Sequence, residues 1–108
     1  MTRKGIPENV KRQLEETVNR FNNEIMQDPD YFYRIRYRGD YVCLGRETFG
    51  TIYPICRLRY TGKVDDWEFA IYKYSGGRYD PDEWMFPGAG YLDGTVEGAL
   101  NAGLGAYP

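Results

Sequence analysis

YFYRIRYRGDYVCLGRETFGTIYPICRLRY, residues 31–60, is the stretch that decides the fold. Aromatic or aliphatic residues alternate with arginines near its start, which is the period of two of a half-buried β-strand. Gly39-Asp40 and Phe49-Gly50 interrupt this alternation as turns. The stretch therefore predicts three successive antiparallel strands joined by short turns. Their ranges are residues 31–38, 41–47 and 51–61.

The flanking segments predict a single α+β domain over residues 1–108. An amphipathic helix of roughly 20 residues begins at Pro7 and ends at Asp28-Pro29, with one apolar stripe: Val10, Leu14, Val18, Phe21 and Ile25. After residue 61, Trp67 to Ser75 forms a fourth strand and residues 79–88 form an ordered aromatic loop. A short Gly/Ala-rich helix, capped by Asp93 or Thr95, closes the chain. We expect an antiparallel sheet of about four strands, packed by these two helices.

The turn at Arg38-Gly39-Asp40 decides which side chains share a face of the sheet. A turn of all three residues buries one set: Tyr33, Ile35, Tyr37, Tyr41, Cys43, Cys56 and Leu58. The opposite face then carries Arg34, Arg36, Arg57 and Arg59 with Val42, Leu44, Tyr53 and Ile55. A two-residue turn would move the side chains of the first strand to the other face. We favour the longer turn because it gathers most arginines on one side.

The two cysteines, Cys43 and Cys56, form neither a disulfide framework nor a metal-ligand pattern. A tight turn at Phe49-Gly50 would place them opposite each other. We interpret them as buried, reduced thiols that act as small apolar residues, with a redox pair as the alternative.

Charge is unevenly distributed along a chain whose formal net charge is −2. Residues 31–79 carry an excess of basic side chains, whereas residues 80–108 carry acidic ones only. Either the sheet binds anions, or the acidic segment folds back and neutralises it. No apolar run is long enough to span a membrane, and the N-terminus lacks the apolar segment of a signal peptide. We therefore expect a cytoplasmic protein.

Catalytic and cofactor motifs are missing from the sequence. It contains no histidine, which removes histidine-based nucleophilic catalysis and histidine-bound zinc. We predict no cofactor and no metal site. The carboxylates Asp80, Asp82 and Glu83, beside Trp84, are interpreted as turn and cap residues. A divalent-cation site or an acid–base catalytic pair is the alternative.

Three strings in the second half of the chain carry a resemblance. They are WEFAIYKYS at 67–75, YDPDEWMFPG at 79–88, and DGTVEGALNAG at 93–103 followed by Ala106-Tyr107-Pro108. In this order they resemble a family of short prokaryotic proteins without an assigned function. The resemblance covers residues 67–108 and implies a small prokaryotic protein. It implies no activity, cofactor or catalytic residues.

The candidate binding site is the arginine-bearing face of the sheet: Arg34, Arg36, Tyr53, Arg57 and Arg59. Guanidinium groups beside aromatic rings bind anions and stack on planar groups. We therefore expect a non-catalytic binding module whose partner is another protein or an acidic or planar ligand, as a monomer or as a homodimer through an exposed edge strand. Single-stranded nucleic acid on the same face is one alternative. The others are an enzyme using Asp80, Asp82 and Glu83, and arginines that merely pair with Glu47, Glu68 or the acidic segment.

Overall fold

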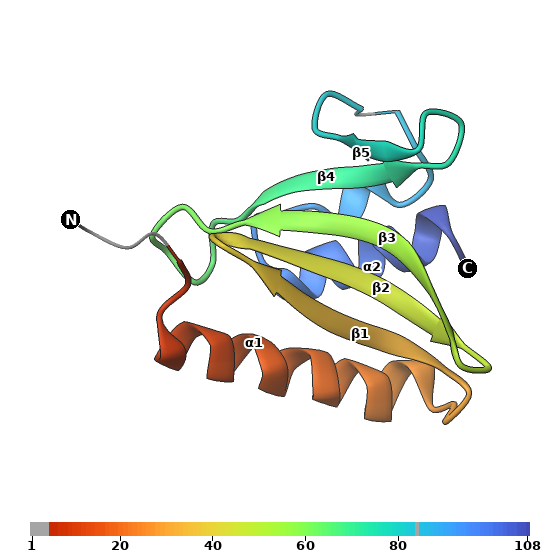
Figure 1. The fold of residues 1–108 in the computed structure, drawn as a ribbon, viewed down its shortest axis with the longest axis horizontal. Helices are drawn as coiled ribbons and strands as arrows, with labels where there is room; N and C mark the ends of the chain where they lie inside the picture. The colour runs from red at the N-terminus through yellow and green to blue at the C-terminus, as the bar shows by residue number, and fades with distance from the viewer. Residues whose placement is uncertain (1–4, 84) are drawn as a thin grey trace.

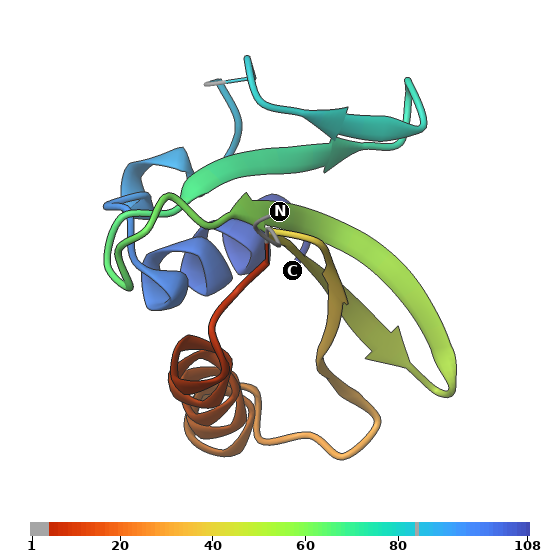
Figure 2. The ribbon, with the colours of Figure 1, turned by 60° about the vertical axis from the view of Figure 1, so that its left-hand side comes forward.

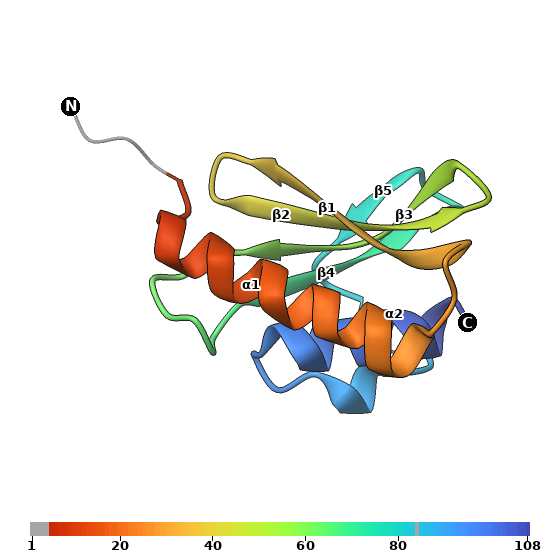
Figure 3. The same ribbon diagram turned by 90° about the horizontal axis from the view of Figure 1, so that it is seen from below.

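The computed structural model describes residues 5–83 and 85–108, and it has one antiparallel sheet with both helices on the same face (Figures 1 and 3). The five strands form a meander in which spatial order follows chain order. The predicted α+β class is confirmed, with one more strand than expected. None of the described helices is long and apolar enough to cross a membrane. The elements are α1 (Glu8–Phe21), η1 (Asn22–Met26), β1 (Tyr31–Arg38), β2 (Tyr41–Thr48), β3 (Thr51–Arg59), β4 (Glu68–Lys73), β5 (Arg78–Asp80), η2 (Ala89–Tyr91) and α2 (Val96–Ala106).

The turn between β1 and β2 has two residues, not the three that we predicted, because Arg38 pairs directly with Tyr41. Gly39 has a φ of 62°, which suits the first position of a type II′ turn and strains any residue with a side chain. Consequently, each side chain of β2 lies on the face of the sheet opposite to the one that the predicted turn would give it. Val42 and Leu44 are fully buried on the helix side, whereas Tyr41 and Cys43 lie on the side away from the helices.

A β-bulge interrupts the pairing of β2 with β3 between Leu44 and Gly45. Next to the Phe49-Gly50 turn, Gly45 is opposite Pro54, which is the register that a tight turn predicts. Beyond the bulge Leu44 is opposite Cys56, so Ile55 is the additional residue. Proline lacks the N–H that a regular ladder needs and is therefore often found at bulges.

The bulge separates the two cysteines, which corrects the prediction that they face each other. Cys43 is opposite Arg57, and Cys56 is opposite Leu44. The two thiols therefore lie on opposite faces of the sheet, and both are free. Cys56 is fully buried as predicted, whereas Cys43 is only partly covered.

A π-helical turn at the end of the first helix changes which residue faces the sheet. The predicted stripe is buried at its first four positions: Val10, Leu14, Val18 and Phe21. In η1 the N–H of Gln27 donates to the carbonyl of Asn22, five residues earlier. This longer step turns Met26 rather than Ile25 toward the core. Ile25 is 54 % exposed, so its predicted place in the stripe is wrong.

The second helix lies close to the sheet because its inner face is made of small residues. Thr95 is the N-cap, as one of the two predicted possibilities, and its hydroxyl accepts a hydrogen bond from the N–H of Gly98 at 3.0 Å. A Cβ atom at Gly103 would lie 2.6 Å from the Tyr33 hydroxyl and 2.7 Å from Ile55 Cγ2. Gly103 is therefore required for this close approach, as the composition of the helix suggested.

The segment predicted to be an aromatic loop forms a short strand and then a partly packed loop. Its first residues include β5, which pairs with β4. Phe86 stacks on Phe69 with ring centroids 5.8 Å apart and so attaches the loop to the core. Met85, next to Phe86, is 90 % exposed. Trp84 lies outside the described residues.

Candidate functional site

The arginines of the predicted site do share one face of the sheet, which we call the outer face because the helices cover the other one (Figure 2). Arg36 is paired with Cys43, and Cys43 with Arg57, so these three side chains form one row across β1, β2 and β3. Arg59 is two residues from Arg57, and Arg34 two residues from Arg36. Relative to the predicted register, the two-residue turn moves the side chains of β2 and β3 to the opposite face, and the bulge moves those after Ile55 back again. The two changes therefore cancel for Arg57 and Arg59.

Tyr53 is the exception among the five predicted site residues. It pairs with Arg46 on the turn side of the bulge, where residues of that register point toward the helices. The bulge at Ile55 therefore separates Tyr53 from Arg57 and Arg59, although all three belong to β3. Tyr53 is not at the centre of the arginine-bearing face, and that part of the prediction is wrong.

A groove of about 520 Å³ runs across the outer face, and we call it the outer groove. All five strands contribute to its walls: Arg34, Ile35, Arg36, Cys43, Gly45, Ile52, Pro54, Tyr72 and Tyr79. Gly45 and Pro54 leave space in the groove because neither carries a long side chain. A volume of this size suits a small ligand or a few side chains of a partner.

Two of the four arginines are neutralised by acidic neighbours on the sheet. Arg34 lies 3.2 Å from Glu47, and Arg59 lies 2.8 Å from Glu68 and 3.8 Å from Asp40. The Arg59 hydrogen bond lowers the pKa of the Glu68 carboxyl. These are the cross-strand partners that the alternative interpretation named. Because the pairs are exposed, each contributes only about 0.2–1 kcal/mol to stability.

Arg36 and Arg57 form no ion pair with any described residue. Arg36 is exposed at the groove wall. Arg57 is half-buried, with its guanidinium carbon 4.4 Å from the centre of the Tyr41 ring and 5.2 Å from that of Tyr79. This stacking holds the guanidinium in place without cancelling its charge. Of the four arginines in the predicted site, these two therefore keep a positive charge that no carboxylate of the sheet neutralises.

The acidic C-terminal segment does not cover the outer groove in the part of the chain that the structure describes. Glu83 binds Lys73 at 2.8 Å and accepts the N–H of Met85. Asp93 accepts hydrogen bonds from the N–H and hydroxyl of Thr95 instead. Glu83 therefore neutralises one lysine of the sheet, on β4, whereas neither of these two carboxylates pairs with an arginine of the outer face.

The carboxylates Asp80, Asp82 and Glu83 do not converge on a common point. Asp80 accepts the N–H of Asp82, which is a local turn contact, whereas Glu83 is engaged with Lys73. Within residues 5–83 and 85–108, no group of three or more metal-ligating side chains comes together. Local turn and cap bonds therefore account for Asp80 and Glu83.

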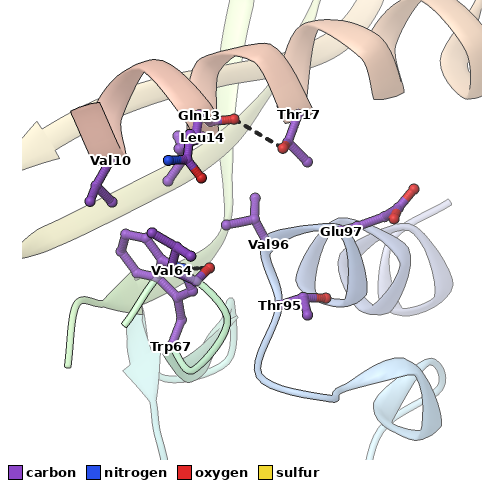
Figure 4. Close-up of a pocket in the computed structure, with 9 residues that line it drawn as sticks. All are labelled: Val10, Gln13, Leu14, Thr17, Val64, Trp67, Thr95, Val96 and Glu97. Carbon is purple, nitrogen blue, oxygen red and sulfur yellow. Dashed lines mark hydrogen bonds between the residues drawn. The ribbon is translucent and has the colours of Figure 1, made fainter. Parts of the chain in front are cut away.

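A second hollow lies on the helix side, between α1, the start of α2 and the loop before β4 (Figure 4). It has a volume of about 170 Å³. Its walls combine apolar side chains, from Val10, Leu14, Val64, Trp67 and Val96, with polar ones, from Gln13, Thr17, Thr95 and Glu97. Some of the polar groups in these walls are already bonded within the chain, because the Trp67 indole N–H donates to the carbonyl of Val64 at 2.9 Å and the Thr17 hydroxyl to the carbonyl of Gln13 at 3.0 Å.

No protein-family model, no curated protein and no solved structure matches this chain. The resemblance of residues 67–108 to short prokaryotic proteins thus stays a prediction. Function is inferred below from the chemistry of the outer groove alone.

Proposed function

We propose that this protein is a non-catalytic binding module that holds an acidic segment of a partner protein in the outer groove. The observation that carries the proposal is the pair of uncompensated arginines, Arg36 and Arg57, on either side of Cys43 on the outer face, where Arg36 and Cys43 line the groove. Carboxylate side chains are the protein groups that a guanidinium binds best, through two parallel hydrogen bonds.

The aromatic rings of the groove favour an acidic peptide over single-stranded nucleic acid. Base binding needs free aromatic faces on which to stack. Here Tyr79 is in contact with the Arg57 guanidinium and also meets Tyr72 edge to face, with ring centroids 5.0 Å apart. Tyr41 also contacts Arg57. The rings are therefore used to position the arginine, which leaves charge as the main means of recognition.

The proposal is tested by titrating an end-blocked hexapeptide of glutamate into the protein and following the arginine Nε–Hε resonances by NMR. We expect the signals of Arg36 and Arg57 to shift, and the affinity to fall as salt rises. The double variant Arg36→Ser/Arg57→Ser should bind at least about tenfold more weakly, since each charge-assisted contact is worth about 1.5–3 kcal/mol.

Two control variants carry the same change of charge. Arg34→Ser/Arg59→Ser removes the arginines that are already paired, and we expect a smaller loss of peptide binding. Arg12→Ser/Arg20→Ser removes two exposed arginines from α1, and binding should not change. Equal losses in all three double variants would reject the groove. Binding of a short oligothymidylate but not of the peptide would replace the proposal with nucleic-acid binding.

A further inference from the structure

Arg46 is a buried guanidinium on the helix side of the sheet, only 2 % exposed. Its Nη1 donates to the Tyr31 hydroxyl at 2.9 Å and to the carbonyl of Tyr107, and its Nη2 donates to the Tyr33 hydroxyl at 2.9 Å. The Tyr31 and Tyr33 rings also contact it, with centroids 5.0 and 4.8 Å from the guanidinium carbon. All of its protein partners are therefore neutral groups.

The charge of Arg46 has no counter-ion among the described residues. The nearest titratable groups are neutral, because burial raises the pKa of the Tyr33 hydroxyl and of the Cys56 thiol. In addition, the Arg46 Nε is buried without a hydrogen-bond partner. Buried charges are normally paired, since an isolated one has lost its water without compensation. Arg46 thus has a charge without a counter-ion and an Nε–H without a hydrogen-bond acceptor.

A cavity of about 240 Å³ lies beside Arg46, and we call it the Arg46 pocket. Half of its lining residues are tyrosines: the lining is Tyr31, Arg46, Thr48, Tyr53, Ile55, Tyr74, Tyr107 and Pro108. Tyr53 and Tyr74 are 47 % and 50 % exposed and border its opening. The Tyr74 hydroxyl donates to the carbonyl of Pro54 at 2.8 Å, and that of Tyr107 to the carbonyl of Tyr72 at 2.6 Å. Both walls are therefore fixed in place.

From this geometry we infer that the Arg46 pocket binds a small aromatic carboxylate. A carboxylate supplies the single negative charge that Arg46 lacks. It is planar, and it pairs with the Nε and Nη2 edge of a guanidinium through two hydrogen bonds. An aromatic ring attached to it would lie among the tyrosine side chains, which favour edge-to-face and offset contacts. The site is on the other side of the sheet from the outer groove.

The test uses benzoate as the probe and benzamide, its neutral analogue of similar shape, as the control. At tenfold over its Kd, benzoate should raise the Tm by roughly 5 °C, whereas benzamide should not. The Arg46 Nε–Hε resonance should shift during the titration. Inorganic phosphate and acetate test charge without the ring, and both should bind more weakly than benzoate. Equal stabilisation by benzoate and benzamide, or an unmoved Arg46 signal, would overturn the inference.

Two matched variants separate binding from folding. Tyr53→Ala removes a wall of the pocket at a half-exposed position, and it should weaken benzoate binding about tenfold, because the benzoate ring loses an aromatic contact. Tyr91→Ala makes the same change at a residue that is 59 % exposed in η2, away from the pocket, and should leave the affinity unchanged. Equal affinities of the two variants would reject the site.

The experiment also distinguishes this inference from the proposed function. Arg36→Ser/Arg57→Ser alters the outer groove alone, so benzoate should stabilise that variant as much as the parent protein. Loss of stabilisation in that variant would place benzoate in the outer groove and reject the Arg46 pocket.

Discussion

Arg46 and Arg57 lie on neighbouring strands and both contact two tyrosine rings, yet they are on opposite faces of the sheet. Arg57 lies between Tyr41 and Tyr79 on the outer face, where solvent reaches it. Arg46 contacts Tyr31 and Tyr33 under the helices, where solvent does not. Tyrosine rings and hydroxyls can therefore hold a guanidinium in either setting. What differs is the cost of leaving the charge without an anion, which is small in water and large in the interior.

The largest expected effect separates the two arginines by their contribution to stability. Arg46→Ala should lower the free energy of unfolding by about 3 kcal/mol, because it leaves a cavity and removes the donor to the Tyr107 carbonyl. Arg57→Ala should cost less than about 1 kcal/mol, since it loses only a partly exposed cation–π contact. Urea unfolding followed by circular dichroism measures both values. Similar losses would show that the two environments do not differ as the structure indicates.

Arg46→Met sharpens this comparison because it keeps most of the volume and removes the charge. Replacing a buried charge by an apolar residue of similar size is often neutral or stabilising. We therefore expect Arg46→Met to stay within about 1 kcal/mol of the parent protein. A loss as large as that of Arg46→Ala would mean that the hydrogen bonds, and not the filled space, hold this region together.

A smaller effect is expected from pH, and it comes from the buried thiol of Cys56. Burial raises the pKa of Cys56, so on alkalinisation the unfolded chain loses this proton first, near its ordinary value of 9.0. Stability should therefore be unaffected by this group below that pH and should fall above it. The loss at pH 10 should be about 1.4 kcal/mol relative to neutral pH.

The alkaline loss is checked by measuring the free energy of unfolding between pH 7 and pH 10. Cys56→Ala removes the buried thiol, so the curve of that variant should be flatter, with Tyr33 still contributing because burial raises its pKa too. A Cys56→Ala curve with the same slope as that of the parent protein would contradict the assignment to Cys56.

The smallest effect on folding is expected from labelling the thiols. Cys43 is partly exposed in the outer groove, whereas Cys56 is fully buried. An aromatic disulfide reagent should therefore modify one thiol per chain in native buffer and two in concentrated urea. In Cys43→Ser the native protein should show no rapid reaction. Rapid modification of two thiols in native buffer would mean that the helix side of the sheet opens readily.

Local patterns were enough to predict α1, α2 and strands β1 to β4, but not the short strand β5 or the π-helical turn η1. The alternation around Arg34 and Arg36 predicted β1, the spacing of Val10, Leu14 and Val18 predicted α1, and Thr95 was among the expected caps. Each of these signals depends on neighbouring residues only. Glycines in α2 also indicated close packing correctly, because Gly103 leaves no room for a Cβ against Tyr33.

The faces of the strands were harder to predict because each depends on a single residue of register. Gly39-Asp40 is compatible with either turn length, and Pro54 indicates an irregularity without saying which neighbour becomes the extra residue. Arg57 and Arg59 were nevertheless placed with Arg34 and Arg36, because the two register differences cancel there. Tyr53 comes before Ile55 in β3, so only the difference caused by the turn applies to it. The face that we predicted for Tyr53 was therefore wrong.

The Arg46 pocket was missed although the sequence contains a signal for it. Val42, Leu44 and Arg46 alternate on one face of β2, so an arginine follows two fully buried residues in the same register. The predicted register placed Val42 and Leu44 on the exposed face. Arg46 consequently looked like one more solvated charge. With the two-residue turn, the same alternation points to a buried arginine.

Asn22 has a consequence for how the molecule behaves in concentrated solution. Its side-chain amide accepts the N–H of Tyr33 at 2.8 Å and donates to the carbonyl of Tyr33 at 3.1 Å, as a peptide group of an adjacent strand would. The free edge of β1 is thus occupied at Tyr33, the third of its eight residues, where a second chain would otherwise continue the ladder. Pairing of another strand with the first part of that edge would have to displace Asn22, which makes strand addition there less favourable.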